Sequence, residues 1–193
     1  MSAGLVVAND NQPHTHRTRF TGNDEWYTPA RYVEMAREVM GQIDVDPASN
    51  EHAQKTVKAA TFYTAETNGL DKEWHGRVWM NPPYSRALIG RFIGKLLAEY
   101  EAGRTTEAIV LTNNSTDTAW FHAMTGEASV CFPRGRIRFV KPCGSLGRTP
   151  PMGQVFTYLG RQHRRFEEVF SAVGFVGTTL ATNDNRRDLF RAA

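Results

Sequence analysis

Two consecutive prolines, Pro82 and Pro83, follow Asn81, which comes directly after the apolar run 78–80, and they end any strand at that point. Proline fixes φ and has no N–H group to donate, so the carbonyl groups of this turn are held rigidly and remain free to accept hydrogen bonds. The residue before a proline is pushed toward extended geometry, which directs the Asn81 side chain off the end of the predicted strand. With Tyr84 supplying an aromatic face, the turn suits a planar group that carries an amino group, such as N6 of adenine. A plain proline-rich loop is the alternative interpretation.

Predicted strands and helices alternate through most of the remaining chain. Apolar runs predict the strands, and amphipathic spacing predicts the helices. The expected strands cover residues 43–47, 77–80, 108–112, 129–132, 137–140 and 154–159, and the expected helices cover residues 30–40, 50–60, 85–100, 120–124 and 166–173. Alternation followed by successive strands predicts a three-layer α/β fold with a mostly parallel sheet. Because ligands bind at the carboxyl ends of such strands, we expect Asp46, Asn81 and Asn113 along one rim.

The chain length of 193 residues predicts one domain with a central sheet. Residues 1–20 lack sustained periodicity and are expected to form a flexible extension. The folded domain is expected over residues 21–181, followed by a tail over residues 182–193. Thr28 is expected to cap the first helix, with Pro29 at the first helical position.

The composition disfavours several classes of protein. No run in the sequence approaches the ~20 apolar residues that span a membrane. The histidines are scattered, so we expect no metal site. The sequence has two cysteines, Cys131 and Cys143, which indicates a reducing, cytoplasmic setting rather than a disulfide scaffold.

Basic residues are concentrated in the second half of the chain. Residues 131–165 contain no Asp or Glu, and residues 131–193 carry a net charge of +7 against +3 for the whole chain. This asymmetry predicts that one face meets a polyanion such as nucleic acid, with a solvated charged surface as the alternative. In the expected strand 137–140, Ile137 and Phe139 would point to the core, so the alternating basic residues would face outward. The expected phosphate contacts are Arg134, Arg136, Arg138 and Lys141.

Asn-Pro-Pro-Tyr resembles the catalytic motif of S-adenosylmethionine-dependent amino methyltransferases, which methylate adenine N6, cytosine N4 or an amide nitrogen. With four weaker motifs, it makes residues 23–177 similar to the small phage-type DNA adenine-N6 methyltransferase (Dam) family. The motifs are Glu25-Trp26-Tyr27-Thr28-Pro29, Asp44-Val45-Asp46-Pro47-Ala48, Asn81-Pro82-Pro83-Tyr84-Ser85, Trp120-Phe121-His122 and Gly135-Arg136-Ile137-Arg138-Phe139. The resemblance implies a Rossmann-like methyltransferase fold with a late antiparallel hairpin, S-adenosylmethionine as cofactor and DNA as substrate.

The resemblance also implies a role for each motif residue. The Asn81 side-chain carbonyl and the Pro82 backbone carbonyl would accept the two N6 hydrogens. Pro83 would fix the turn, and Tyr84 would stack on the base. Since an adenine in duplex DNA is unreachable in the stack, the base must be flipped out. The residues implied in cofactor binding are Tyr27, Thr28, Pro29, Asp44, Asp46 and Ala48, with Asp46 meeting either the ammonium group or the ribose.

Three features leave alternatives open. The Gly-x-Gly turn expected after the first cofactor strand is missing, so the Asp44–Ala48 motif could belong to either the first or the second cofactor strand. Asp46-Pro47 could also be an ordinary turn or a helix start. Gly69-Leu70-Asp71 could wall the cofactor adenine or form a surface turn. The activity could also be methylation of a glutamine amide in a protein, or the chain could be a nucleic-acid-binding module that has lost catalysis.

Overall fold

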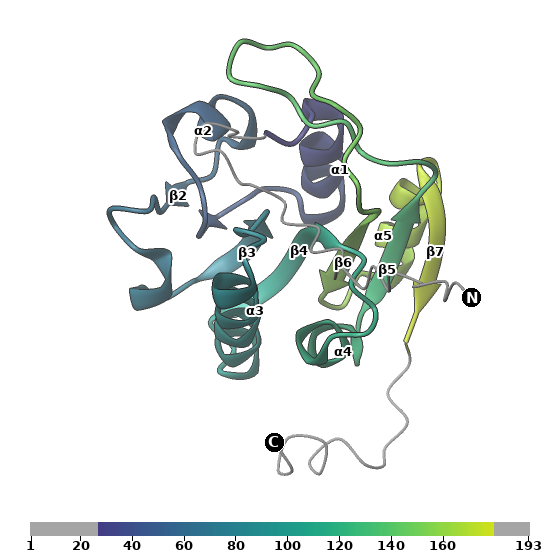
Figure 1. Ribbon diagram of the computed structural model, residues 1–193. Helices are drawn as coiled ribbons and strands as arrows, with labels where there is room; N and C mark the ends of the chain where they lie inside the picture. The colour runs from purple at the N-terminus through teal and green to yellow at the C-terminus, as the bar shows by residue number, and fades with distance from the viewer. Residues whose placement is uncertain (1–26, 180–193) are drawn as a thin grey trace, which may run out of the picture.

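In the computed structural model, residues 27–179 are described, and they form a seven-stranded sheet packed between helices (Figure 1). The expected extension 1–20, Trp26 and the tail 182–193 lie outside the described residues. In chain order the elements are α1 (Ala30–Met40), β1 (Val45–Asp46), α2 (Glu51–Val57), β2 (Thr61–Phe62), the 3-10 helix η1 (Gly69–Asp71), β3 (Gly76–Met80), α3 (Arg86–Glu101), β4 (Thr105–Asn113), α4 (Ala119–Thr125), β5 (Ser129–Pro133), β6 (Gln154–Leu159), α5 (His163–Phe170) and β7 (Gly174–Thr178).

The sheet has the strand order β2-β1-β3-β4-β6-β5-β7. β2, β1, β3 and β4 pair in parallel, and β6 pairs antiparallel with both β4 and β5. β7 pairs antiparallel with β5, so five of the seven strands share one direction, while β6 and β7 run against them. The expected mostly parallel sheet is confirmed, and its antiparallel part extends over three strand pairs rather than one hairpin.

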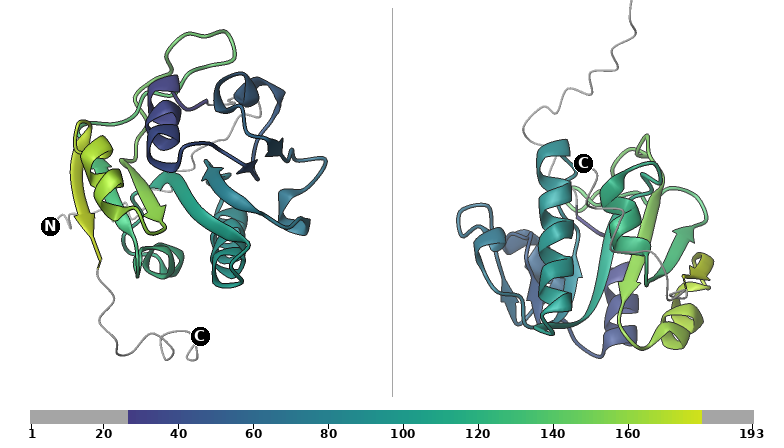
Figure 2. Two further views of the ribbon diagram at one scale, coloured as in Figure 1. Left: turned by 180° about the vertical axis from the view of Figure 1, so that it is seen from behind. Right: turned by 90° about the horizontal axis from the view of Figure 1, so that it is seen from below.

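Alternating side chains along the central strands divide the core into two layers. Trp79 of β3 and Ile109 and Leu111 of β4 are buried on the face covered by α1 and α5. Val78 and Val110 are buried on the opposite face, against α3 and α4. The turned views in Figure 2 show these two helix pairs on opposite sides of the sheet. The three-layer arrangement expected from the sequence is therefore confirmed.

Three strand assignments differ from the sequence-based expectation. β2 has only two residues and β7 contains two glycines, so neither gives the apolar alternation that predicts a strand. The strand expected over residues 137–140 was wrong, because its backbone forms only isolated β-bridges at Val140. Gly135, with a φ of 76°, turns the chain directly before this segment. Ile137 and Phe139 are nevertheless buried, as their alternation predicted.

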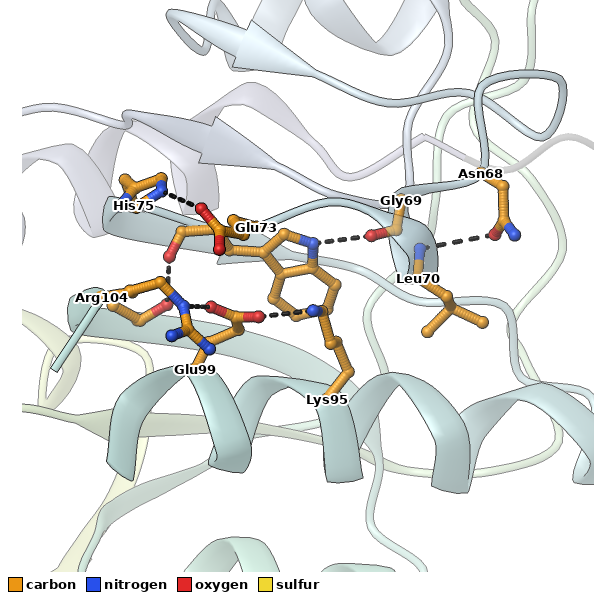
Figure 3. A network of polar contacts seen from close by, with 10 residues as sticks. Asn68, Gly69, Leu70, Glu73, His75, Lys95, Glu99 and Arg104 are labelled. Carbon is orange, nitrogen blue, oxygen red and sulfur yellow. Dashed lines mark hydrogen bonds and ion pairs between the residues drawn. The ribbon is translucent and has the colours of Figure 1, made fainter. Parts of the chain in front are cut away.

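A polar network joins η1 and α3 at the end of the sheet where β3 and β4 begin (Figure 3). The Glu99 side chain is 1% exposed and forms ion pairs with Lys95 and Arg104. The Trp74 indole donates to the Gly69 carbonyl at 2.8 Å. Burial alone would raise the pKa of Glu99, but hydrogen bonds from Arg104 and Lys95 lower it to about 2. This end of the molecule is therefore held by a carboxylate that stays ionised.

Candidate active site

A cavity of about 980 Å³ opens at the carboxyl ends of the central parallel strands. Asp46 at the end of β1, Asn81 directly after β3 and Asn113 at the end of β4 all line it. Parallel strands that lie side by side end at the same edge of the sheet, so the topology itself brings these side chains together. The structure places the three on one rim, as the sequence analysis expected.

The expected catalytic turn and most of the expected cofactor contacts share this cavity. The sequence-predicted residues that line it are Tyr27, Thr28, Asp46, Ala48, Asn81, Pro82, Pro83 and Tyr84. Two expected cofactor residues, Pro29 and Asp44, do not line it. The cavity therefore joins residues from three separate parts of the chain, 27–28, 46–48 and 81–84.

The Asn81 amide is held through both its oxygen and its nitrogen. The Tyr84 hydroxyl donates to Asn81 Oδ1 at 2.7 Å, and Asn81 Nδ2 lies 3.3 Å from Thr28 Oγ1 as its donor. The same Tyr84 hydroxyl lies 3.4 Å from the Leu111 carbonyl, a second acceptor. Burial raises the pKa of Tyr84, so its hydroxyl stays protonated and able to donate. These contacts orient Oδ1 of Asn81 as an acceptor toward the tyrosine.

Thr28 does not cap α1, contrary to the prediction from the sequence. Pro29 occupies the N-cap position, with φ −55° and ψ 136°, and no side chain caps the helix there. Thr28 precedes a proline and is therefore kept from helical geometry. Its hydroxyl is directed to Asn81 instead, and the residue is buried. Thr28 therefore forms part of the cavity wall and does not cap α1.

Asp46 is a buried carboxylate in the cavity lining, with 3% of its surface exposed. Its Oδ2 accepts from Gln54 Nε2 at 2.9 Å, and its Oδ1 accepts from the Ala48 N–H at 3.4 Å. Burial raises the pKa of Asp46 from 3.8 to about 6, against the lowering effect of hydrogen bonds from Ser49, Ala48 and Gln54. A carboxylate in this state is stabilised by an incoming cation or by further donors.

The Asp44 carboxylate forms hydrogen bonds within the fold and does not line the cavity. Its Oδ2 accepts from the Arg77 N–H at 2.7 Å, and its Oδ1 accepts from Gln42 Nε2 at 2.5 Å. Gly76 approaches this carboxylate so closely that a Cβ would lie 2.4 Å from Oδ2. Asp44 therefore fastens the residues before β1 to the start of β3.

The connection between β5 and β6, residues 134–153, reaches past the end of the sheet near α1 and α2 (Figure 1). We refer to these residues as the β5–β6 arm. Its last part and the first residue of β6 contribute to the cavity lining Arg148, Thr149, Pro150, Pro151, Met152 and Gln154. The sequence analysis missed this wall, although Pro150-Pro151 repeats the rigid dipeptide of the Asn81 turn.

Two of the expected phosphate contacts bind the arm to itself. Arg136 Nη1 donates to the Pro150 carbonyl at 3.1 Å, and Arg138 Nε donates to the Gly147 carbonyl at 3.2 Å. We call the part of the arm that leaves β5 the outgoing limb, and the part that leads into β6 and lines the cavity the returning limb. Both guanidinium groups join the outgoing limb to the returning limb.

β6 divides the acid-free segment 131–165 between two ends of the molecule. Arg134 is exposed and Lys141 half-buried, and both lie on the arm. Arg165 follows the far end of β6, on α5, and pairs with Glu38 at 2.7 Å. The arm therefore lies beside the cavity, whereas Arg165 lies at the other end of β6.

Other features singled out from the sequence lie outside the cavity. His122 on α4 packs edge-on against Phe121, and Gly69-Leu70-Asp71 forms η1. Among residues 27–179, no group of His, Cys, Asp and Glu side chains could hold a metal ion. Over the same described range, no helix has the length and apolar character needed to cross a membrane. Neither His122 nor η1 adds a functional group to the cavity.

Comparison with known proteins gives a family match and curated relatives. The model of the family described as DNA N-6-adenine-methyltransferase (Dam) matches residues 15–163. A DNA N-6-adenine-methyltransferase of Escherichia phage T1 is 37% identical over 101 residues, which is 51% of this chain and 39% of that protein. A protein of the same name from Haemophilus phage HP1 (strain HP1c1) is 31% identical over 127 residues, which is 64% of this chain and 70% of that protein. The chain thus spans well under half of the first relative and somewhat over two thirds of the second.

Proposed function

The chain belongs to the DNA N-6-adenine-methyltransferase (Dam) family, and on that premise we propose that it transfers a methyl group from S-adenosylmethionine to N6 of an adenine in DNA. The observation that supports this most directly is the joint placement of Asn81 and Asp46 in one cavity of about 980 Å³. Small-molecule sites reach roughly 1,000 Å³, so this volume has room for a cofactor beside an extruded base. The adjacent parallel strands β1, β3 and β4 support a Rossmann-like methyltransferase fold, with the catalytic domain within residues 21–181.

Tyr27, Thr28, Asp46 and Ala48 form the cofactor end of the proposed site. The Asp46 carboxylate accepts from the ammonium group of the cofactor, whose positive charge offsets the cost of burying the carboxylate. Asp44 acts here only by fixing β1 against β3. When bound, S-adenosylmethionine supplies a methyl group on a positively charged sulfur, which departs as a neutral thioether. A buried carboxylate with a raised pKa in the cavity wall fits such a cationic ligand.

The Asn81 turn forms the base end of the proposed site. Asn81 Oδ1 and the Pro82 carbonyl accept the two N6 hydrogens, and the Tyr84 ring lies against the purine. The adenine amine replaces the Tyr84 hydroxyl at Oδ1, and the hydroxyl turns to the Leu111 carbonyl, its second acceptor at 3.4 Å. Engaging both hydrogens draws the N6 lone pair out of the ring system, so N6 can form the new N–C bond.

The reaction at N6 needs preorganised acceptors rather than a general base. After the N–C bond has formed, N6 carries a positive charge and is strongly acidic, so its extra proton leaves readily to solvent. The acceptors of the Asn81 turn are already in place before the reaction, and such fixed dipoles stabilise developing charge without reorganisation. The position of His122 outside the cavity is consistent with this chemistry.

The test is to incubate the purified protein with methyl-labelled S-adenosylmethionine and plasmid DNA, and to identify labelled nucleosides by mass spectrometry. We expect N6-methyladenine. Asn81→Ala is expected to lower turnover by roughly two to three orders of magnitude, the scale for losing one preorganised contact in a transition state. Affinity for S-adenosylhomocysteine, measured by calorimetry, is expected to stay nearly unchanged in this variant.

Two results would contradict the proposal in different ways. Label found in N4-methylcytosine, or in glutamine of an added protein, with none in adenine would overturn the assigned substrate. Near-wild-type turnover by Asn81→Ala would leave the substrate in place and overturn the assigned mechanism.

A further inference from the structure

Met152 is an exposed apolar side chain at the cavity. Within the described part of the chain, the large apolar side chains that are exposed are Leu146 (53%), Met152 (44%) and Phe175 (69%). Of these three, Met152 alone lines the cavity. A single exposed apolar side chain is ordinary on a protein surface. What distinguishes Met152 is how its backbone is held.

The backbone of Met152 is fixed from both directions. Pro150 and Pro151 lock φ immediately before it. Gln154, itself 3% exposed, donates from Nε2 to the Met152 carbonyl at 2.7 Å. The Oε1 of the same Gln154 accepts from the Ile137 N–H at 2.8 Å. One buried side chain therefore joins the two limbs of the β5–β6 arm next to Met152.

Gly153 fastens the arm to the loop that follows β4. Its carbonyl accepts from the Asn114 N–H at 3.0 Å. A Cβ at Gly153 would lie 2.8 Å from Asn114 Nδ2, so a larger residue would require the Asn114 side chain to move. Asn113, the neighbour of Asn114, lines the same cavity as Met152. The methionine is thus presented at a fixed place on the cavity wall rather than on a loose loop.

We propose that the Met152 side chain enters the DNA base stack and fills the space vacated by the adenine that turns into the cavity; this role rests on the proposed function. Extrusion of a base leaves a gap between its neighbours, and apolar side chains such as Met fill gaps of this kind. The thioether chain is flexible and polarisable, so it adapts to the faces of the flanking bases. Its fixed backbone reduces the ordering cost of insertion.

The β5–β6 arm also carries a positive charge near Met152, whose proposed role in the base stack we call the wedge. Arg148, four residues before Met152, is exposed and lines the same cavity. A cation in this position suits the phosphates that flank the extruded nucleotide. An apolar side chain and a cation on one limb match a DNA partner that offers both base faces and phosphates.

The experiment compares kcat/KM on two duplexes that carry the target sequence mapped with the wild-type protein. In one the target adenine is paired with thymine, and in the other it is mispaired and already easier to extrude. Met152→Ala is expected to lower kcat/KM by about ten- to a hundredfold on the paired duplex, because nothing then fills the gap. On the mispaired duplex the loss is expected to stay within about threefold, since less unstacking is required.

Two further variants test whether the loss of activity comes from the missing apolar side chain at position 152 or from a general effect on the protein. Met152→Leu keeps an apolar chain of similar size and is expected to restore most of the activity on the paired duplex. Phe175→Ala removes an exposed apolar side chain on β7, away from the cavity, and is expected to treat both duplexes as the wild type does. Equal losses on the two duplexes with Met152→Ala, or no loss on the paired one, would overturn the wedge. Absence of N6-methyladenine from both duplexes with the wild-type protein would overturn the proposed function and this role with it.

Discussion

In the proposed mechanism, the Tyr84 hydroxyl and the adenine amine compete for one atom, Oδ1 of Asn81. In the ligand-free arrangement the hydroxyl donates to that atom at 2.7 Å, with the Leu111 carbonyl 3.4 Å away as its alternative acceptor. The hydroxyl can therefore release Asn81 without becoming a buried donor that lacks a partner. The ring of Tyr84, in contrast, is required by the proposed stacking on the base.

We expect Tyr84→Phe to retain turnover within about tenfold of the wild type, a change of roughly 1.4 kcal/mol in the barrier. Tyr84→Ala is expected to lose far more, because stacking requires the ring. Single-turnover kinetics with saturating DNA measure both variants. If the phenylalanine variant were as inactive as the alanine variant, the hydroxyl would take part in the methyl transfer itself.

If Asp46 binds the cofactor as proposed, the ionisation of this one carboxyl group makes cofactor affinity depend on pH. Well below pH 3.8 the Asp46 carboxyl group is protonated in the folded and the unfolded chain alike. Between 3.8 and about 6 the unfolded chain loses this proton first, so the stability of the ligand-free protein falls as pH rises. Above that range the full cost of the buried charge is present, on the order of 3 kcal/mol.

Asp46→Asn is therefore expected to shift stability and cofactor affinity in opposite directions. Chemical denaturation should show that the wild type loses stability relative to the variant between about pH 4 and pH 6, and that the difference then stays constant. Calorimetry should show weaker S-adenosylhomocysteine binding by the variant, and wild-type affinity that rises with pH over the same range. A wild-type affinity that is flat across this range would place Asp46 on the ribose or away from the cofactor.

The β5–β6 arm is the element in which the four expected phosphate contacts divide into two kinds. Arg136 and Arg138 donate to carbonyls of the returning limb, so part of their hydrogen-bonding capacity is used within the arm. Arg134 and Lys141 lie on the same arm outside those two contacts. Phosphate contacts contribute to affinity on all DNA sequences alike, and their loss lowers the salt dependence of binding.

Arg134→Gln and Lys141→Gln are each expected to lower the slope of log K against log salt by about one. Arg136→Gln and Arg138→Gln are expected to lower it by less, and to make the arm more sensitive to limited proteolysis, because the two limbs lose a tie. Fluorescence anisotropy over a salt series measures the slopes. Unchanged slopes in all four variants would place the DNA on another surface.

The two ends of the sheet have different roles in the molecule: one forms the cavity, and the other is stabilised by ion pairs. The carboxyl ends of β1, β3 and β4 form the cavity, while β3 and β4 begin beside the buried Glu99 network. The pKa of Glu99 lies below its ordinary value of 4.5, so its stabilising effect is complete above that pH and is lost as pH falls toward about 2. Because the cavity and the Glu99 network lie at opposite ends of the sheet, substitutions in the two places are expected to act independently on stability.

Glu99→Gln is therefore expected to lower the free energy of unfolding near pH 7 by about 2 kcal/mol, a figure reduced for the solvent exposure of Lys95 and Arg104. The difference from the wild type should narrow as pH falls from about 4.5 to 2, because the wild-type carboxylate is then protonated as well. Methylation by the folded variant should match the wild type. A variant that loses stability equally at all pH values would show that packing, and not charge, is what Glu99 supplies.

Sequence patterns predicted those parts of the molecule whose structure depends on residues close together in the chain. The family resemblance was confirmed, and so were α1, α3 and the run of parallel strands, because their amphipathic and apolar patterns are long. Asn81 was placed at the end of its strand by the two prolines that follow it. Met152 and Gln154 reach the same cavity only because β6 returns antiparallel beside β4, a long-range pairing that no short pattern encodes. Thr28 was misassigned because its partner, Asn81, lies 53 residues away.

Gln154 ties the backbone at Ile137 to the backbone at Met152, and the residues between them lie outside the seven strands, held also by the bridge between Tyr27 and Val140. A stretch anchored in this way can change its length and composition over evolutionary time while the sheet stays untouched. Exchange of one contiguous piece of gene would then replace the part of the cavity wall that carries Met152 and Arg148, and would leave the Asn81 turn in place. Inheritance of the Asn81 turn and inheritance of this wall are, in this architecture, separable events.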